Sequence, residues 1–181
     1  MAQPAESLAL TEEEKASPLY QKLSGAESVC FVGDSITHGT KNGGFGWYRP
    51  LEALLNNVTE CAVGGATTKS ILPEVPTGSG MYVVAIGTND IRYRDEDICA
   101  MTAEDYIAEL ERFVQRVRSE NSAAKFAFVA PWTSLDNDSV SVLNTAERTR
   151  MNNEYTEKLK AWCSENGHLF SDPNDLIDEV M

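Results

Sequence analysis

Short apolar runs alternate along the chain with longer segments in which apolar residues recur every three or four positions. The runs predict β-strands and the periodic segments predict amphipathic helices. The predicted strands are residues 28–32, 58–63, 81–86, 126–130 and a short one that begins at residue 169. The predicted helices are residues 11–23, 47–56, 68–72, 103–119 and 145–166. This alternation indicates a parallel sheet with helices on both of its faces.

Two local signals refine this picture. Residues 81–86 (MYVVAI) are almost continuously apolar, which is typical of a strand covered on both faces. Thr11 and Glu14 have the spacing of a capping box, and Pro18 is expected to limit or kink the first helix. We therefore predict an α/β protein with a three-layer α/β/α, flavodoxin-like fold and a central, mostly parallel five-stranded sheet. No repeat or linker divides residues 1–181, which we expect to form a single domain after a loose start at residues 1–10.

Composition and charge exclude several classes of partner. The 181 residues are 42% hydrophobic, which is ordinary for a soluble globular domain. The 15 basic and 28 acidic residues leave a net charge of −13, the opposite of what a nucleic acid or an anionic membrane attracts. No apolar run approaches the roughly 20 residues that span a bilayer, and the first residues lack the features of a secretory signal. We therefore predict a cytoplasmic protein with no nucleic-acid or membrane partner.

The cysteines fit this compartment. Cys30, Cys61, Cys99 and Cys163 form no C-x-x-C pair, so the sequence suggests neither a zinc site nor a thioredoxin-like motif. We expect reduced and mostly buried thiols.

Three glycine-containing loops follow the first three predicted strands. They are residues 33–39 (GDSITHG), 63–67 (VGGAT) and 87–90 (GTND). Because the carboxyl ends of parallel strands meet at one edge of the sheet, these loops should border a common crevice. There Ser35 would supply a hydroxyl, and the Ser35 N–H, the Gly65 N–H and the Asn89 amide would supply three donors. Acyl transfer needs such a set, because negative charge develops on the carbonyl oxygen when the hydroxyl attacks.

The three loops resemble the first three sequence blocks of the SGNH (GDSL-type) hydrolases, with a likeness that covers roughly residues 28 to 170. The first and third blocks are specific, whereas the second lacks its usual leading Asn. The resemblance implies that Ser35 is the nucleophile and that Ser35, Gly65 and Asn89 build the oxyanion hole. Members of this superfamily are esterases, thioesterases, lipases and carbohydrate O-acetyl esterases, generally without a metal or an organic cofactor, so we expect no cofactor here.

The chain departs from this family in its fourth block, where an Asp-x-x-His motif supplies the general base and the acid that orients it. The two histidines, His38 and His168, stand in no such motif, and Asp172 and Asp175 have the spacing without the imidazole. A carboxylate with an ordinary pKa near ~4 is a poor base for an alcohol. We interpret His38 as a turn or rim residue more readily than as a base. His168 follows a helix-ending Asn-Gly pair and should enter the last strand at its amino end, the wrong edge of the sheet.

Two explanations of this departure stay open. One is that the sequence is cut before a last helix, with the Asp and His supplied by further residues. The other is that the chain has no proper base, which would leave an impaired hydrolase or a ligand-binding domain that keeps the donor cluster. Loss of a triad base costs several orders of magnitude in rate, although oxyanion donors alone retain some.

Aromatic and charged residues in the loops bear on the substrate. Trp47 and Tyr48 are expected to pack on the sheet rather than to form a rim, and residues 92–97 to be a solvated loop; Trp132 after the fourth strand offers an aromatic wall. The short linkers leave no room for a large lid, which favours a small acyl group such as acetate. We predict a serine acyl-ester hydrolase that acts on carbohydrate or small-molecule O-acetyl esters. The alternatives are a binding or interaction domain and an O-acyltransferase that uses the same serine. A nucleotide-binding domain is disfavoured because no phosphate-binding glycine motif follows a strand.

Overall fold

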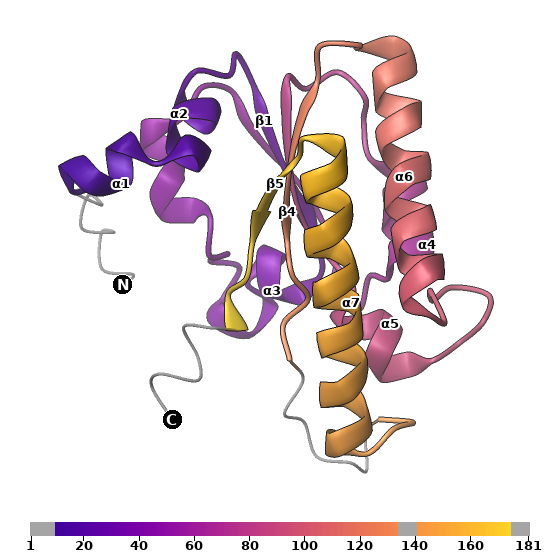
Figure 1. Cartoon of the computed structure of the whole chain (residues 1–181). Coiled ribbons are helices and arrows are strands. Elements are labelled where there is room, and N and C mark those ends of the chain that lie inside the picture. Colours follow the sequence, from indigo (N-terminus) through magenta and orange to yellow (C-terminus); the bar gives the residue numbers. More distant parts are fainter. Residues whose placement is uncertain (1–9, 134–140, 175–181) are drawn as a thin grey trace.

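The computed structural model describes residues 10–133 and 141–174 and contains one five-stranded sheet in the order β2-β1-β3-β4-β5. All neighbouring strands are parallel. The strands are β1 (Val29–Gly33), β2 (Val58–Ala62), β3 (Met81–Ala85), β4 (Lys125–Val129) and β5 (Leu169–Ser171). This arrangement confirms the predicted α/β class and the parallel five-stranded sheet (Figure 1).

Helices cover both faces of the sheet, as Figure 1 shows. The α-helices are α1 (Glu12–Ala16), α2 (Pro18–Ser24), α3 (Ser35–His38), α4 (Thr68–Ile71), α5 (Thr88–Tyr93), α6 (Ala103–Glu120) and α7 (Thr145–Asn166). Three short 3-10 helices are η1 (Thr40–Asn42), η2 (Arg49–Leu54) and η3 (Leu72–Glu74). None of these helices is both long and apolar enough to cross a membrane.

The strands separate two apolar clusters. On one face, alternate residues of the strands, such as Val32, Val84 and Phe128, pack against α4, α6 and α7. On the other face, Phe31 and Val83 pack against α2 and the segment that contains η2. β1 and β3 are buried along their whole length, as a strand between two helical layers must be. The predicted three-layer arrangement is therefore confirmed.

The helix predictions hold best for the long segments. α7 has the predicted bounds and α6 differs from them by one residue, because both combine a capping box with an apolar stripe. The predicted helix 11–23 is divided into α1 and α2 at Ser17, where Pro18 begins the second helix, and the capping box of Thr11 and Glu14 is present. Of the predicted loose start, only residue 10 lies within the described part of the chain.

Predictions for two shorter segments differ from the structure, one wholly and one in part. Residues 47–56 were expected to form an α-helix, but they contain the six-residue 3-10 helix η2, where the Leu51 N–H donates to the carbonyl of Tyr48. Pro50 near its start has no N–H to donate, and no η2 residue is fully buried, so little favours a longer helix. The prediction of a solvated loop at residues 92–97 holds in part. Arg92 and Tyr93 complete α5, a helix that the sequence pattern did not predict, whereas residues 94–97 follow it outside any helix or strand, with Asp95, Glu96 and Asp97 exposed.

Candidate active site

Ser35 is the first residue of α3, a single helical turn that follows β1 directly. Asp34 caps this turn, since its side-chain oxygen accepts the N–H of Ile36 at 2.9 Å. Gly33 has no room for a side chain, because a Cβ there would lie 2.2 Å from Thr37 Oγ1 and 2.7 Å from the carbonyl oxygen of Ala85. The Gly-Asp-Ser order therefore lets α3 pack closely on the end of the sheet, with Ser35 half-buried at its edge.

Gly65 lies in a tight turn after β2, in which the Ala66 N–H donates to the carbonyl of Val63 at 3.0 Å. Its φ of 79° is in the left-handed region that favours glycine. A Cβ at Gly65 would contact the Tyr93 hydroxyl oxygen at 3.4 Å. Among the described residues, neither the Ser35 N–H nor the Gly65 N–H donates a hydrogen bond, so both are available to a ligand.

Asn89 joins the three predicted loops. Its buried side-chain amide donates to the carbonyl of Ala66 at 2.9 Å and approaches Asp34 Oδ2 at 3.5 Å. Ala66 is the neighbour of Gly65, and Asp34 is the neighbour of Ser35. The structure thus brings the loops of Ser35, Gly65 and Asn89 together at one sheet edge. The Asn89 amide, predicted to be a donor at this edge, bridges the two other loops.

Two buried carboxyl groups that the sequence pattern did not predict organise this edge. Asp90 accepts hydrogen bonds from the Thr68 N–H, the Thr68 hydroxyl and the Ala100 N–H, at 3.0, 2.5 and 2.7 Å. Burial raises the pKa of Asp90 to about 6 against the opposing effect of these bonds. Burial also raises the pKa of Asp34 to about 6, with a further contribution from the charge of Asp90. The sequence signal for both groups is an acidic residue that directly follows a Gly or an Asn after a strand, as in Gly33-Asp34 and Asn89-Asp90.

The raised pKa of Asp34 predicts a pH dependence of stability. Its carboxyl group has a higher pKa in the folded than in the unfolded chain. Above pH 6 the group is ionised in both states, and its buried charge then lowers the free energy of unfolding. This loss of stability disappears as the pH falls toward 4 and the group becomes protonated in the folded chain. The unfolding free energy of wild type minus that of Asp34→Asn should therefore become more positive, by about 1–3 kcal/mol, between pH 7 and pH 4. Urea unfolding of both proteins at several pH values measures this difference. A flat difference, or one that falls with falling pH, would contradict the assignment.

A surface hollow of about 450 Å³ lies beside Ser35. Its walls combine aromatic, polar and glycine residues: Ile36, Gly39, Lys41, Asn42, Phe45, Gly46, Trp47 and Pro50. Trp47 is half-buried and its indole N–H donates to Thr37 Oγ1 at 3.2 Å. Tyr48 stacks on Phe31 with ring centroids 4.5 Å apart and is buried. Packing of Tyr48 in the core agrees with the prediction, whereas Trp47 serves both the core and the hollow.

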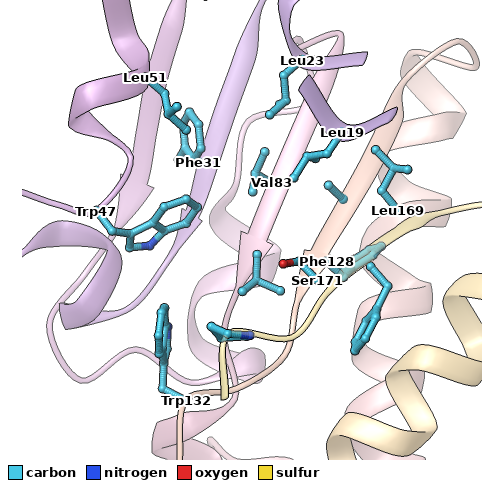
Figure 2. A pocket seen from close by; sticks show the side chains of 14 residues that line it. Leu19, Leu23, Phe31, Trp47, Leu51, Val83, Phe128, Trp132, Leu169 and Ser171 are labelled. Carbon is cyan, nitrogen blue, oxygen red and sulfur yellow. The ribbon is translucent and has the colours of Figure 1, made fainter. Parts of the chain in front are cut away.

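A second, almost entirely apolar cavity of about 230 Å³ lies between the sheet and α2 (Figure 2). Trp132, expected to border the crevice of Ser35, lines this cavity instead. Figure 2 shows Trp47 and Trp132 at the same end of the cavity, with Leu19 and Leu23 of α2 toward the other end. Trp47 is therefore the wall that the cavity shares with the hollow of Ser35.

The acid–base candidates occupy different surroundings. His168 is buried at the amino end of β5 against Phe126, Phe128 and Trp162, as its position after α7 predicted. Burial and the nearby charges of Arg118 and Lys22 lower its pKa to about 4. Asp172 accepts hydrogen bonds from the backbone and side-chain N–H groups of Asn174, and Asp175 lies outside the described residues.

Within the described ranges, no three His, Cys, Asp or Glu side chains are grouped as metal ligands.

Comparisons with known proteins address the family and the fold. A sequence model described as the GDSL-like lipase/acylhydrolase family matches residues 31–180. No curated protein sequence matches the chain.

Several solved structures share the fold at low sequence identity. A carbohydrate acetylesterase family member from Sinorhizobium meliloti is 18% identical with a TM-score of 0.62, over 81% of this chain and 82% of that one. A GDSL-like lipase from Bacteroides thetaiotaomicron is 15% identical with a TM-score of 0.60, over 81% and 68% of the chains. A mutant of an acetyl-xylooligosaccharide esterase from a Geobacillus species is 21% identical with a TM-score of 0.57, over 83% and 78%.

Proposed function

Because this chain belongs to the GDSL-like lipase/acylhydrolase family, we propose that it is a serine ester hydrolase with Ser35 as its nucleophile. The observation that carries the proposal is the convergence of three loops at one sheet edge, through the Asn89 amide and its bonds to Ala66 and Asp34. Ser35 and Gly65 are the immediate neighbours of those two partners. Acyl transfer requires such an arrangement of one hydroxyl with several N–H groups.

The oxyanion hole in this proposal consists of the Ser35 N–H, the Gly65 N–H and the Asn89 amide. Both backbone groups are without an acceptor in the described part of the chain, and the first N–H groups of a helix attract negative charge. The Asn89 amide would donate one of its two hydrogens to the oxyanion while the other remains on the Ala66 carbonyl. When an oxyanion binds, the Asn89 amide therefore gives up its 3.5 Å contact with Asp34 Oδ2 and keeps its 2.9 Å hydrogen bond to the Ala66 carbonyl.

The proposed substrates are O-acetyl esters of carbohydrates or other small alcohols. The hollow beside Ser35 contains Phe45 and Trp47, which suit a sugar ring, and Lys41 and Asn42, which suit its hydroxyl groups. Two structural neighbours, a mutant of an acetyl-xylooligosaccharide esterase and a carbohydrate acetylesterase family member, support this class. No cofactor is required for this chemistry.

The test measures turnover and covalent labelling together. The protein should hydrolyse p-nitrophenyl acetate and an acetylated xylo-oligosaccharide faster than p-nitrophenyl palmitate. An alkyl fluorophosphonate should add its phosphonyl mass to the peptide that contains Ser35. Rates equal to buffer and no labelled serine would contradict the proposal and favour a binding domain. Transfer of acetyl to an added alcohol, without free acetate, would identify an O-acyltransferase.

A further inference from the structure

The side chain of Tyr93 borders the space over Gly65. Apart from the chain neighbours of Gly65, a Cβ placed on this glycine would have two atoms of the described residues within 4 Å. Both belong to Tyr93: the hydroxyl oxygen at 3.4 Å and Cε2 at 4.0 Å. Because a Cβ is one bond of roughly 1.5 Å from its Cα, the Tyr93 hydroxyl oxygen lies within about 5 Å of the Gly65 Cα. The described residues thus leave this space open except on the side of the phenol.

One face of α5 supplies both Asn89 and Tyr93. The two residues are four apart in this helix, and residues four apart share a face. The Asn89 amide donates to the carbonyl of Ala66 at 2.9 Å, and Tyr93 reaches Gly65, one residue earlier in the same turn. The helix that places the Asn89 amide therefore also places the Tyr93 ring next to the Gly65 backbone.

The Tyr93 ring is accessible to a ligand. Its side chain is among the exposed large apolar residues, at 37% exposure, and its hydroxyl forms no hydrogen bond within the described part of the chain. The Arg92 guanidinium lies 5.6 Å from the centre of the ring, which is a cation–π distance. The helix ends at once, since the Arg94 N–H donates to the carbonyl of Asp90 at 3.3 Å. The ring therefore presents an apolar surface to solvent at the end of α5.

The hollow of Ser35 and the space over Gly65 lie toward different faces of the sheet. The hollow is on the side of Trp47, which packs edge-on against Phe31 in one apolar cluster. Ala66 and Ile91, close in sequence to Gly65 and Tyr93, belong to the cluster on the other face. Neither Gly65 nor Tyr93 lines the hollow. An ester whose carbonyl oxygen binds between the loops therefore has different surroundings for its two ends.

The geometry of an ester relates these surroundings to its acyl end. An oxyanion on the Gly65 N–H would lie about 2.9 Å from that nitrogen. The acyl carbon is one bond from this oxygen, and the acyl chain begins one bond further on. With the alcohol part in the hollow beside Ser35, the acyl chain extends on the side of Gly65. There a chain longer than the acetyl methyl group meets the ring of Tyr93.

We propose that Tyr93 determines acyl specificity: its ring ends the acyl-binding space over Gly65 and so selects acetyl over longer acyl groups. This inference rests on the proposed esterase function and assigns a residue to its preference for short acyl groups. Tyr93 acts by occupying space, so its ring matters and its hydroxyl does not. Its effect falls on the binding of long acyl chains, whereas an acetyl ester is hydrolysed with or without it.

The test compares wild type, Tyr93→Ala, Tyr93→Leu and Tyr93→Phe on p-nitrophenyl acetate, butyrate and hexanoate, after circular dichroism has shown each variant to be folded. Tyr93→Ala should raise the ratio of kcat/KM for hexanoate to that for acetate by about 10-fold or more, since one methylene in a pocket changes kcat/KM by about 10- to 200-fold. Tyr93→Leu should raise the ratio less, and Tyr93→Phe, which keeps the ring, should keep the wild-type ratio.

Tyr20→Ala is the matched control. Tyr20 is a half-buried tyrosine of α2 that borders neither the hollow of Ser35 nor the space over Gly65, so its replacement should leave the ratio unchanged. A general loosening of the fold by loss of a tyrosine ring would instead change the ratio in Tyr20→Ala as well, and would count against a specific role of Tyr93.

The outcomes separate this inference from the proposed function. If acetate hydrolysis depends on Ser35 but the ratio is unchanged in Tyr93→Ala, the role of Tyr93 is overturned and the esterase function stands. A changed preference among acetates of different alcohols, with an unchanged acyl ratio, would also overturn it and would assign the alcohol part to Tyr93. A wild-type protein without hydrolysis that depends on Ser35 would overturn both.

Discussion

Replacing Ser35 by alanine should lower kcat for p-nitrophenyl acetate by at least about 1,000-fold, the usual size of the loss when a catalytic nucleophile is removed. In the proposed mechanism no acyl-enzyme can then form, and only the donors of the proposed oxyanion hole remain to assist attack by water. The fold should change little, because the Ser35 hydroxyl accepts and donates no hydrogen bond among the described residues, and Asp34 keeps its cap on α3. The measurement is steady-state hydrolysis with the unfolding free energy determined in parallel.

Ser171→Ala is the matched control for this substitution. Ser171 is also half-buried, lies at the end of β5, and lines the apolar cavity rather than the hollow of Ser35. Its replacement should leave kcat within about two-fold of wild type, since surface-near substitutions outside a site usually cost little. Equal activity of wild type and Ser35→Ala would remove Ser35 from the mechanism.

Replacing Asp90 by alanine should lower the free energy of unfolding by about 3–5 kcal/mol. The Asp90 carboxyl group is buried and accepts three donors, and each donor left buried without an acceptor costs about 1–3 kcal/mol. Those donors belong to Thr68 at the start of α4 and to Ala100 before α6. The substitution therefore loosens the connection between α5 and two other segments, in addition to leaving a small cavity.

Urea unfolding at pH 7 measures this loss, with Asp97→Ala as the control. Asp97 is exposed, and its carboxylate accepts no hydrogen bond within the described ranges, so its replacement should change the unfolding free energy by less than about 0.5 kcal/mol. A loss below about 1 kcal/mol for Asp90→Ala would mean that water satisfies the orphaned donors and that the carboxyl group is not structurally required.

The apolar cavity and the hollow of Ser35 place different demands on substrate. The hollow is larger and more open to polar groups, whereas the cavity between α2 and the sheet is nearly free of them. Trp47 lies between them. Its indole N–H donates a hydrogen bond to the hydroxyl of Thr37, a residue of α3 that packs against Gly33. The hollow is therefore the space next to the proposed nucleophile that suits the alcohol part of a polar ester.

The sequence by itself determined the architecture and the three loops. Strand and helix periods are local properties of the chain, and right-handed parallel connections leave few ways to arrange five strands. The carboxyl ends of such strands must share an edge, so the sequence alone predicts that the loops of Ser35, Gly65 and Asn89 meet there. The roles of these three residues in catalysis remain predictions.

Only the tertiary structure decided the local chemistry at that edge. Asn89 and Asp90 are poor helix formers in isolation, yet they stand in α5, because Ala66, Thr68 and Ala100 satisfy their side chains. The pairing of His38 with Glu60 joins residues 22 positions apart. It depends on the register of β2 beside β1 and on the short turn of α3. Such contacts carry no periodic signal in the sequence, since they arise from distant segments that packing brings within hydrogen-bond distance.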